Sequence, residues 1–164
     1  MSPDGPPGGR QGVERSTAPH ARGRRTPLKE RVGSAAEAAL RERKFVTAID
    51  VLTGIGWLLP KDVEAWRRGQ VPYLERVVHA NLHKISTAMH LFRAWAAANG
   101  LRPSETAYMS HTRRRHVLRF SRSGDEGIER AYRTHFLSPE LAAAKALRRR
   151  GHESEAADRP VADP

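Results

Sequence analysis

The sequence predicts a mainly α-helical protein with one β-hairpin, and three patterns carry this prediction. Apolar residues recur every three or four positions from residue 74 to residue 96, as they do along one face of a helix. The same spacing recurs between Phe45 and Ile55. Apolar and polar residues then alternate over 106–110 and 116–120, which is typical of two half-buried strands. We therefore expect a small helical bundle with a long central helix and a hairpin at about 106–120.

Both ends of the 164-residue chain have the composition of disordered segments. Residues 1–28 begin MSPDGPPGGR and continue rich in arginine, so they offer little apolar surface to offset the entropy lost on ordering. The last residues are polar and end in proline. We expect a disordered basic arm over 1–28, a single domain over 29–150 and a disordered tail over 151–164.

Four helices are expected before the hairpin. Residues 28–43 are rich in alanine, glutamate and leucine, and a second helix is expected over 45–58. Pro60 fits the first turn of a short helix over 61–68, and Gly69 fits its end. The long central helix is expected from Pro72 to residue 99, before Gly100. Trp57 and Trp66 are expected to pack together where the two short helices meet.

Two helices are expected after the hairpin. The first covers 125–134 and carries Ile128, Ala131 and Tyr132 on one face. The second begins at Ser138-Pro139-Glu140, with serine as the N-cap and proline in the first turn, and runs to about Arg149.

Composition excludes several classes of function. The chain has no cysteine, so it has neither disulfides nor thiolate metal sites, and no apolar run is long enough to span a bilayer. It has no secretory signal, so we expect it to be cytoplasmic. The net charge is +11, and residues 44–137 hold 15 basic but only 8 acidic residues. A basic excess within the folded region favours a polyanionic partner.

The strongest candidate site is the arginine-rich tip of the predicted hairpin. Glu105 is the only acid between residues 102 and 122, so a polyanion would relieve the repulsion among the arginines. Tyr108 and Phe120 are interleaved with this charge, as in nucleic-acid readers; alternatively, they are core residues beneath a solvated turn. The residues predicted to contact nucleic acid are Arg102, Arg113, Arg114, Arg115, His116, Arg119 and Arg122.

The order of the elements is also compatible with a winged helix-turn-helix. In that arrangement the long helix would enter the major groove and the hairpin would form the wing. A recognition helix over 73–99 is longer than usual, and a bundle with an appended hairpin is the alternative. The predicted reading face consists of Tyr73, Arg76, His79, Ala80 and His83.

His79, His83 and His90 lie along one side of the predicted long helix. They lack the glutamate of an HExxH motif, so we expect no metal and no other cofactor. The residues around them are uncharged, which suggests a face that meets a protein partner or a second copy. A helical adaptor or homodimer without nucleic-acid binding is therefore the alternative function. A hydrolase with His79 or His83 as base is a third, but no catalytic constellation is evident, so we expect no enzymatic activity.

The block from Phe45 to Phe136 resembles small uncharacterised bacterial proteins. The resemblance rests on the segments DVLTGIGWL, VPYLERV, RPSETAY and LRFSRSG, and it implies no particular activity. The sequence therefore predicts nucleic-acid binding mainly through phosphate contacts. DNA and RNA remain open, because RNP1, KH and zinc-finger motifs are all absent.

Overall fold

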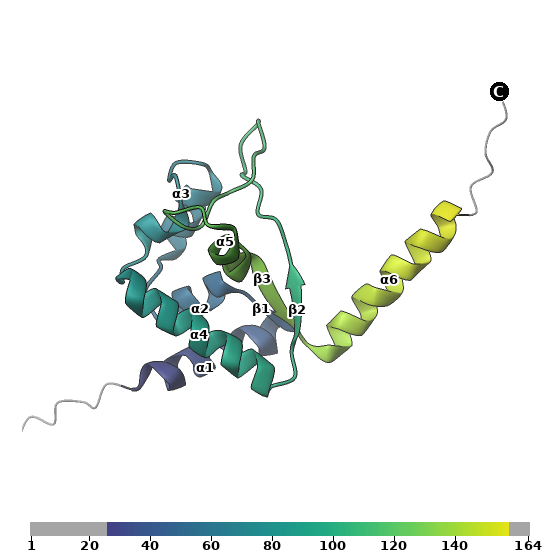
Figure 1. Cartoon of the computed structure of the whole chain (residues 1–164), viewed down its shortest axis with the longest axis horizontal. Coiled ribbons are helices and arrows are strands. Elements are labelled where there is room, and N and C mark those ends of the chain that lie inside the picture. The colour runs from purple at the N-terminus through teal and green to yellow at the C-terminus, as the bar shows by residue number, and fades with distance from the viewer. Residues whose placement is uncertain (1–25, 158–164) are drawn as a thin grey trace, which may run out of the picture.

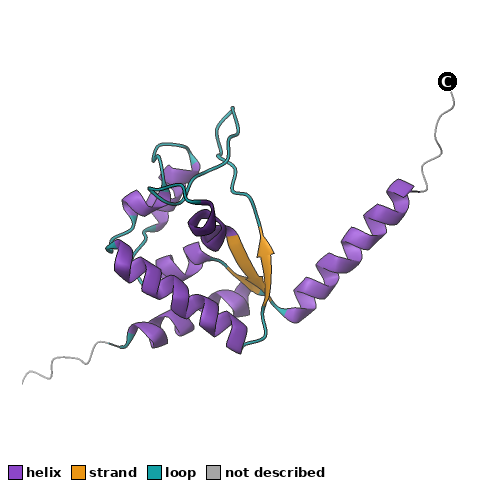
Figure 2. Ribbon diagram, viewed as in Figure 1, coloured by secondary structure: helices purple, strands orange, loops and turns teal. Residues whose placement is uncertain are grey.

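The computed structural model describes residues 26–157 and is mainly helical, as predicted. Helices form most of the body, a small antiparallel sheet closes one side, and one helix projects away from it (Figures 1 and 2). The predicted arm over 1–28 lies outside the described residues as far as residue 25. The elements are α1 (Leu28–Arg43), β1 (Phe45–Val46), α2 (Ala48–Gly54), α3 (Pro60–Arg67), the 3₁₀ helix η1 (Leu74–Val77), α4 (Leu82–Ala98), β2 (Arg102–Glu105), α5 (Glu126–Arg133), β3 (Thr134–Leu137) and α6 (Pro139–Ala157).

The sheet is a feature that the sequence patterns did not predict. Its strand order is β1-β3-β2, and both pairings are antiparallel. Leu137 is the partner of Phe45 on one side and of Arg102 on the other. Pro103 fits β2 because β2 is an edge strand, where a missing amide donor is tolerated.

Helix α1 has the bounds expected from the sequence. Its buried residues are small or β-branched: Val32, Ala36 and Ala39. It ends at Lys44, which has a left-handed backbone (φ 65°) and donates its N–H to the Leu40 carbonyl at 2.8 Å. This cap turns the chain directly into β1.

The helix expected over 45–58 is shorter in the structure. Phe45 and Val46 form strand β1, and α2 begins only after Thr47. Thr47 and Asp50 form a reciprocal capping box, in which each side chain accepts a hydrogen bond from the other residue's backbone N–H. This cap sets the start of α2 and leaves Phe45 free to pair with β3.

The predicted long helix from residue 72 to residue 99 is wrong in its first third. The amides of Leu74 and Glu75 donate to the carbonyls of Arg119 and Phe120, at 3.2 and 2.9 Å, instead of to a preceding helical turn. The chain forms only the short η1 there, and α4 starts after Asn81, whose side chain accepts from the Lys84 amide at 2.9 Å. The apolar residues at the start of this pattern are therefore buried by a loop and a short 3₁₀ helix rather than by one continuous helix.

Helix α6 starts as predicted but continues past Arg149 to Ala157. Residues 151–157, assigned above to a disordered tail, are therefore helical; the rest of that segment lies outside the described residues. The helix touches the body through its first turns, where Lys145 donates to the Ser104 hydroxyl at 2.7 Å. Beyond that point it projects from the body (Figure 1), and Leu147 is left 67% exposed.

An aromatic cluster forms the core beneath α3. Trp66 is fully buried, and its ring centroid lies 4.9 Å from that of Phe120 and 5.8 Å from that of Tyr108. Its indole N–H donates to the Arg119 carbonyl at 2.8 Å. The expected pairing with Trp57 is not observed, because Trp57 is only half-buried and lies beneath the Arg31 guanidinium.

None of the helices between residues 26 and 157 combines the length and apolar character that crossing a bilayer requires.

Candidate functional site

The predicted hairpin is a narrow projecting loop rather than two regular strands. A single bridge joins Met109 to Val117, and two backbone bonds flank it, from Ser110 to His116 at 2.8 Å and from Leu118 to Tyr108 at 2.7 Å. The strands expected at about 106–120 are thus reduced to a few paired residues. We call residues 110–116 the arginine loop; it stands clear of the body (Figure 1).

The base of the arginine loop is held by a buried serine. The Ser110 hydroxyl lies 2.9 Å from the Thr112 hydroxyl and 3.0 Å from His116 Nδ1, and it accepts the His116 amide at 3.1 Å. The His111 amide donates to the Arg67 carbonyl at 2.7 Å, which ties the loop to α3. These bonds fix the direction in which the tip points.

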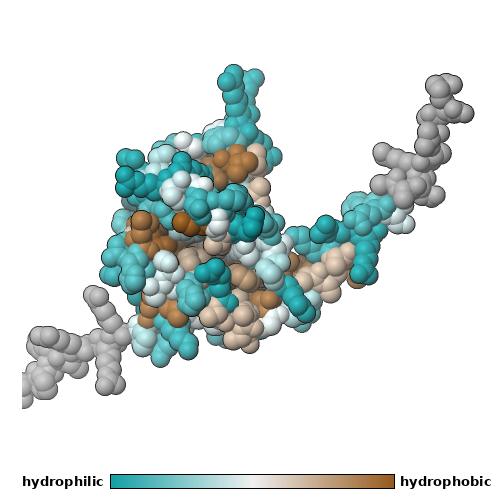
Figure 3. Space-filling model, in the orientation of Figure 1, coloured by the Kyte–Doolittle hydropathy of each residue, from teal (hydrophilic) through white to brown (hydrophobic). Residues whose placement is uncertain are grey.

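The tip carries three consecutive exposed arginines, Arg113, Arg114 and Arg115. Within the part of the chain that the structure describes, none of them forms an ion pair with an acidic side chain. Figure 3 shows the tip as a hydrophilic arm above the surface. The tip therefore presents uncompensated positive charge on a narrow support.

Of the other predicted contact residues, only His116 lies in the arginine loop. Arg102 lies in β2, in register with Leu137. The Arg119 guanidinium turns back onto its own loop, donating to the carbonyls of Ser121, at 2.8 Å, and Arg122. Arg122 donates its amide to Glu75 and lines a cavity described below. His116 belongs to the base of the arginine loop.

Tyr108 and Phe120 are core residues and do not accompany the charge at the surface. Both are buried, with ring centroids 5.1 Å apart in an edge-to-face arrangement. The Tyr108 hydroxyl lies 2.7 Å from His135 Nε2. Burial raises the pKa of Tyr108 to about 12 and lowers the pKa of His135. The two aromatic residues are therefore part of the core, as in the alternative given above.

The recognition helix expected for a winged helix-turn-helix does not form over residues 73–99. The five residues of its predicted reading face fall on different elements: Tyr73 is extended, Arg76 lies in η1, His79 and Ala80 lie in the following loop, and His83 lies in α4. No continuous helix spans them.

The predicted histidine line is divided in the same way. His79 lies in the loop, with its Nε2 atom 3.7 Å from an Asp62 oxygen, whereas His83 and His90 are exposed on α4. Among the side chains of residues 26–154, no three histidine or acidic groups gather as metal ligands would. What remains is an exposed, uncharged strip along α4, formed by His83, Thr87, His90, Ala94 and Ala97.

A buried carboxylate supports the segment after the arginine loop, and the sequence analysis missed it. Glu129 is 7% exposed, and its oxygens accept the amides of Phe120, at 3.0 Å, and Ser121, at 2.7 Å, and the Ser121 hydroxyl at 2.6 Å. The expected inner face of α5 is therefore shifted: Glu129 and Tyr132 point inward, and Ile128 is 43% exposed. Helical spacing does not distinguish this face from the expected one, because Ile128 and Ala131 are also three residues apart.

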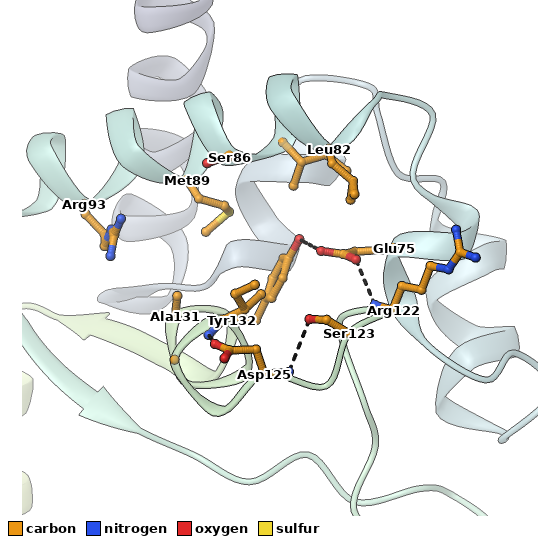
Figure 4. A pocket seen from close by; sticks show the side chains of 13 residues that line it. Glu75, Leu82, Ser86, Met89, Arg93, Arg122, Ser123, Asp125, Ala131 and Tyr132 are labelled. Atoms are coloured by element: carbon orange, nitrogen blue, oxygen red, sulfur yellow. Dashed lines mark hydrogen bonds between the residues drawn. The ribbon is translucent and has the colours of Figure 1, made fainter.

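A cavity of about 710 Å³ lies between α4 and α5 (Figure 4). Glu75 and Tyr132 lie beside it, joined by a hydrogen bond of 2.9 Å from the tyrosine hydroxyl to the carboxylate. Burial, together with the Glu75 charge, raises the pKa of Tyr132 far above its usual range, so its hydroxyl stays protonated and remains a donor. No sequence pattern indicated this cavity, because its walls come from segments far apart in the chain.

Comparison with known proteins adds no relative. No family model matches the chain, and neither a curated protein nor a solved structure does.

Proposed function

We propose that the protein binds nucleic acid through phosphate contacts made by the arginine loop. The observation that carries this proposal is the exposure of Arg113, Arg114 and Arg115, without acidic partners among the described residues, at the tip of an anchored projection. Three guanidinium groups so placed repel one another in the free protein. Binding to a phosphate backbone replaces that repulsion with charge-assisted hydrogen bonds and releases counterions.

The positions of the other arginines limit the number of residues expected to contact nucleic acid. Arg119 is held by carbonyls of its own loop, and Arg102 lies in the sheet, so the proposal assigns the contacts to the three tip residues. A narrow loop without exposed Phe, Tyr or Trp side chains suits backbone contacts, which carry little base information. We therefore expect weak sequence preference, and binding is proposed for DNA and RNA alike.

The test is the salt dependence of binding to a fluorescent duplex. Each phosphate contact contributes about 0.9 to the slope of log affinity against log salt concentration. Replacing Arg113, Arg114 and Arg115 together by alanine should lower that slope by up to about 3 units and weaken binding to all sequences equally.

A matched control is available in the same chain. Arg148, Arg149 and Arg150 form a second exposed run of three arginines, on α6, and their replacement by alanine changes the net charge equally. This control, and deletion of residues 1–27, should reduce the slope less than the arginine-loop variant. Equal losses from both triple variants would refute a specific role for the arginine loop.

A second candidate function is self-association, and the exposed strip along α4 favours it. His83, Thr87, His90, Ala94 and Ala97 lie on one face and carry no Lys, Arg, Asp or Glu side chain. Two copies could pack these strips together without burying a fixed charge, and the alanines allow close approach. Light scattering should then give a dimer mass that falls to the monomer value in Ala94→Glu, with no change in Lys84→Glu, which lies off the strip.

A further inference from the structure

The cavity between α4 and α5 has the size and lining of a small-molecule site. Its volume of about 710 Å³ falls within the range of about 300 to 1,000 Å³ common for such sites. Leu82, Ile85 and Met89 line it from α4, and Ile128 and Ala131 line it from α5. Leu82 is 61% and Ile128 43% exposed, so apolar surface faces solvent at this opening.

The two carboxylates that line the cavity form hydrogen bonds within the protein. Glu75 accepts the Tyr132 hydroxyl through Oε1 and the Arg122 amide through Oε2, each at 2.9 Å. Asp125 accepts the Ile128 amide at 3.1 Å and thereby caps α5. Both oxygens of Glu75 therefore have partners within the protein, and Asp125 is held at the N-terminus of α5 by its capping bond.

Two arginines also line the cavity. Arg93 and Arg122 form no ion pair within residues 26–154, and they lie at opposite ends of the cavity (Figure 4). Arg122 extends away from Tyr132, whereas Arg93 descends from α4 on the side of Ala131. Arg93 is thus the cation best placed for a group bound between the helices.

We propose that this cavity binds a small amphipathic anion, with an apolar body between α4 and α5 and a carboxylate held by the Arg93 guanidinium. The apolar walls select a hydrocarbon or aromatic body. A planar guanidinium matches a carboxylate through two parallel hydrogen bonds, which selects the anionic head group. The proposal is independent of nucleic-acid binding, because none of its residues belongs to the arginine loop.

The test compares decanoate with decanol and decyltrimethylammonium, which share an alkyl chain and differ in head-group charge. Binding to the full-length protein is followed by backbone amide chemical shifts. Decanoate should shift the amides of Met89, Arg93 and Ile128 and bind at least about tenfold more tightly than decanol, as expected for a charge-assisted bond. Equal affinity for all three probes would overturn the assignment of an anion.

Variants separate the head-group contact from the apolar site. Arg93→Gln should lower decanoate affinity about tenfold, to the level of decanol, and leave decanol unchanged. Arg149→Gln, which removes the same charge from α6, should change neither affinity. Undiminished decanoate binding in Arg93→Gln would refute the role of this arginine.

Two further variants test the location of the apolar body. Ala131→Phe and Ser86→Phe enlarge lining side chains on opposite helices, so each should abolish the binding of decanoate and decanol. Circular dichroism and amide-shift dispersion would verify that each variant is folded; Ser86 is exposed, so its replacement spares the core. Binding that persists in a folded variant, or shifts confined to other parts of the protein, would place the ligand elsewhere.

Discussion

Removal of the Glu129 carboxylate should be among the most destabilising single changes in this protein. Glu129→Ala leaves the amides of Phe120 and Ser121 and the Ser121 hydroxyl without their acceptor, in a site that is almost closed to water. Each buried donor left unpaired costs about 1 to 3 kcal/mol. We therefore expect a loss of about 3 to 6 kcal/mol in the free energy of unfolding, allowing for partial rehydration of the site.

Urea denaturation followed by tryptophan fluorescence measures this loss, because Trp66 packs against Phe120. Glu129→Gln keeps one acceptor oxygen and nearly the same shape, so it should cost clearly less, about 1 to 2 kcal/mol. Glu126→Ala on the same helix is the matched control and should cost less than about 1 kcal/mol, since the Glu126 side chain is exposed and Arg133 keeps Glu105 as a partner. A loss below about 1 kcal/mol in Glu129→Ala would refute the reasoning.

Three further results are expected. Trp66→Ala should cost about 3 to 5 kcal/mol in the free energy of unfolding, because the ring is fully buried, while the half-buried Trp57 should cost less; denaturant titration compares the two. Gly54→Ala should cost about 1 to 3 kcal/mol, because its new Cβ would lie 2.5 Å from the Cβ of Ala35, and Ala35→Gly should restore much of that loss in thermal melts of the double variant. Burial lowers the pKa of His135 from 6.5, so the unfolded state binds the proton more readily and the free energy of unfolding should fall as pH drops below about 6.5. Denaturation across that pH range should show a flatter profile in His135→Gln.

Local signals were sufficient for the helices whose ends are set by nearby residues. Pro60 and Gly69 bracket α3, and the serine-proline pair at 138–139 marks the start of α6. In each case the hydrogen bonds or backbone angles that end the helix come from residues next to it. The periodicity and the caps therefore agree in the sequence and in the structure.

The sheet and the start of α4 depend on distant residues and could not be predicted in the same way. A strand of two residues such as β1 is too short to show alternation. Leu74 has the spacing of a helical residue, but its amide is bonded to the Arg119 carbonyl, a partner that the local pattern does not reveal. At this position the long-range hydrogen bond forms in place of the local helical one.

Only the charged part of the candidate site could be predicted from the sequence. The exposed arginine tip follows from three adjacent arginines in a polar turn. The burial of Tyr108, and the cavity beside Tyr132, follow from packing between segments that are far apart in the sequence. The charge of a residue can be read from the sequence directly, whereas a cavity forms only when several segments of the chain pack together.

The strand order has a consequence for the route by which the protein folds. Strands β1 and β2 are never neighbours, since each pairs only with β3, which follows both of them in the chain. A nascent chain that has not yet exposed Thr134–Leu137 can form α1 to α4, but it holds two isolated strands without partners. Sheet formation must then close long loops in one late step, which slows folding and leaves the edges of β1 and β2 open to other chains in the meantime.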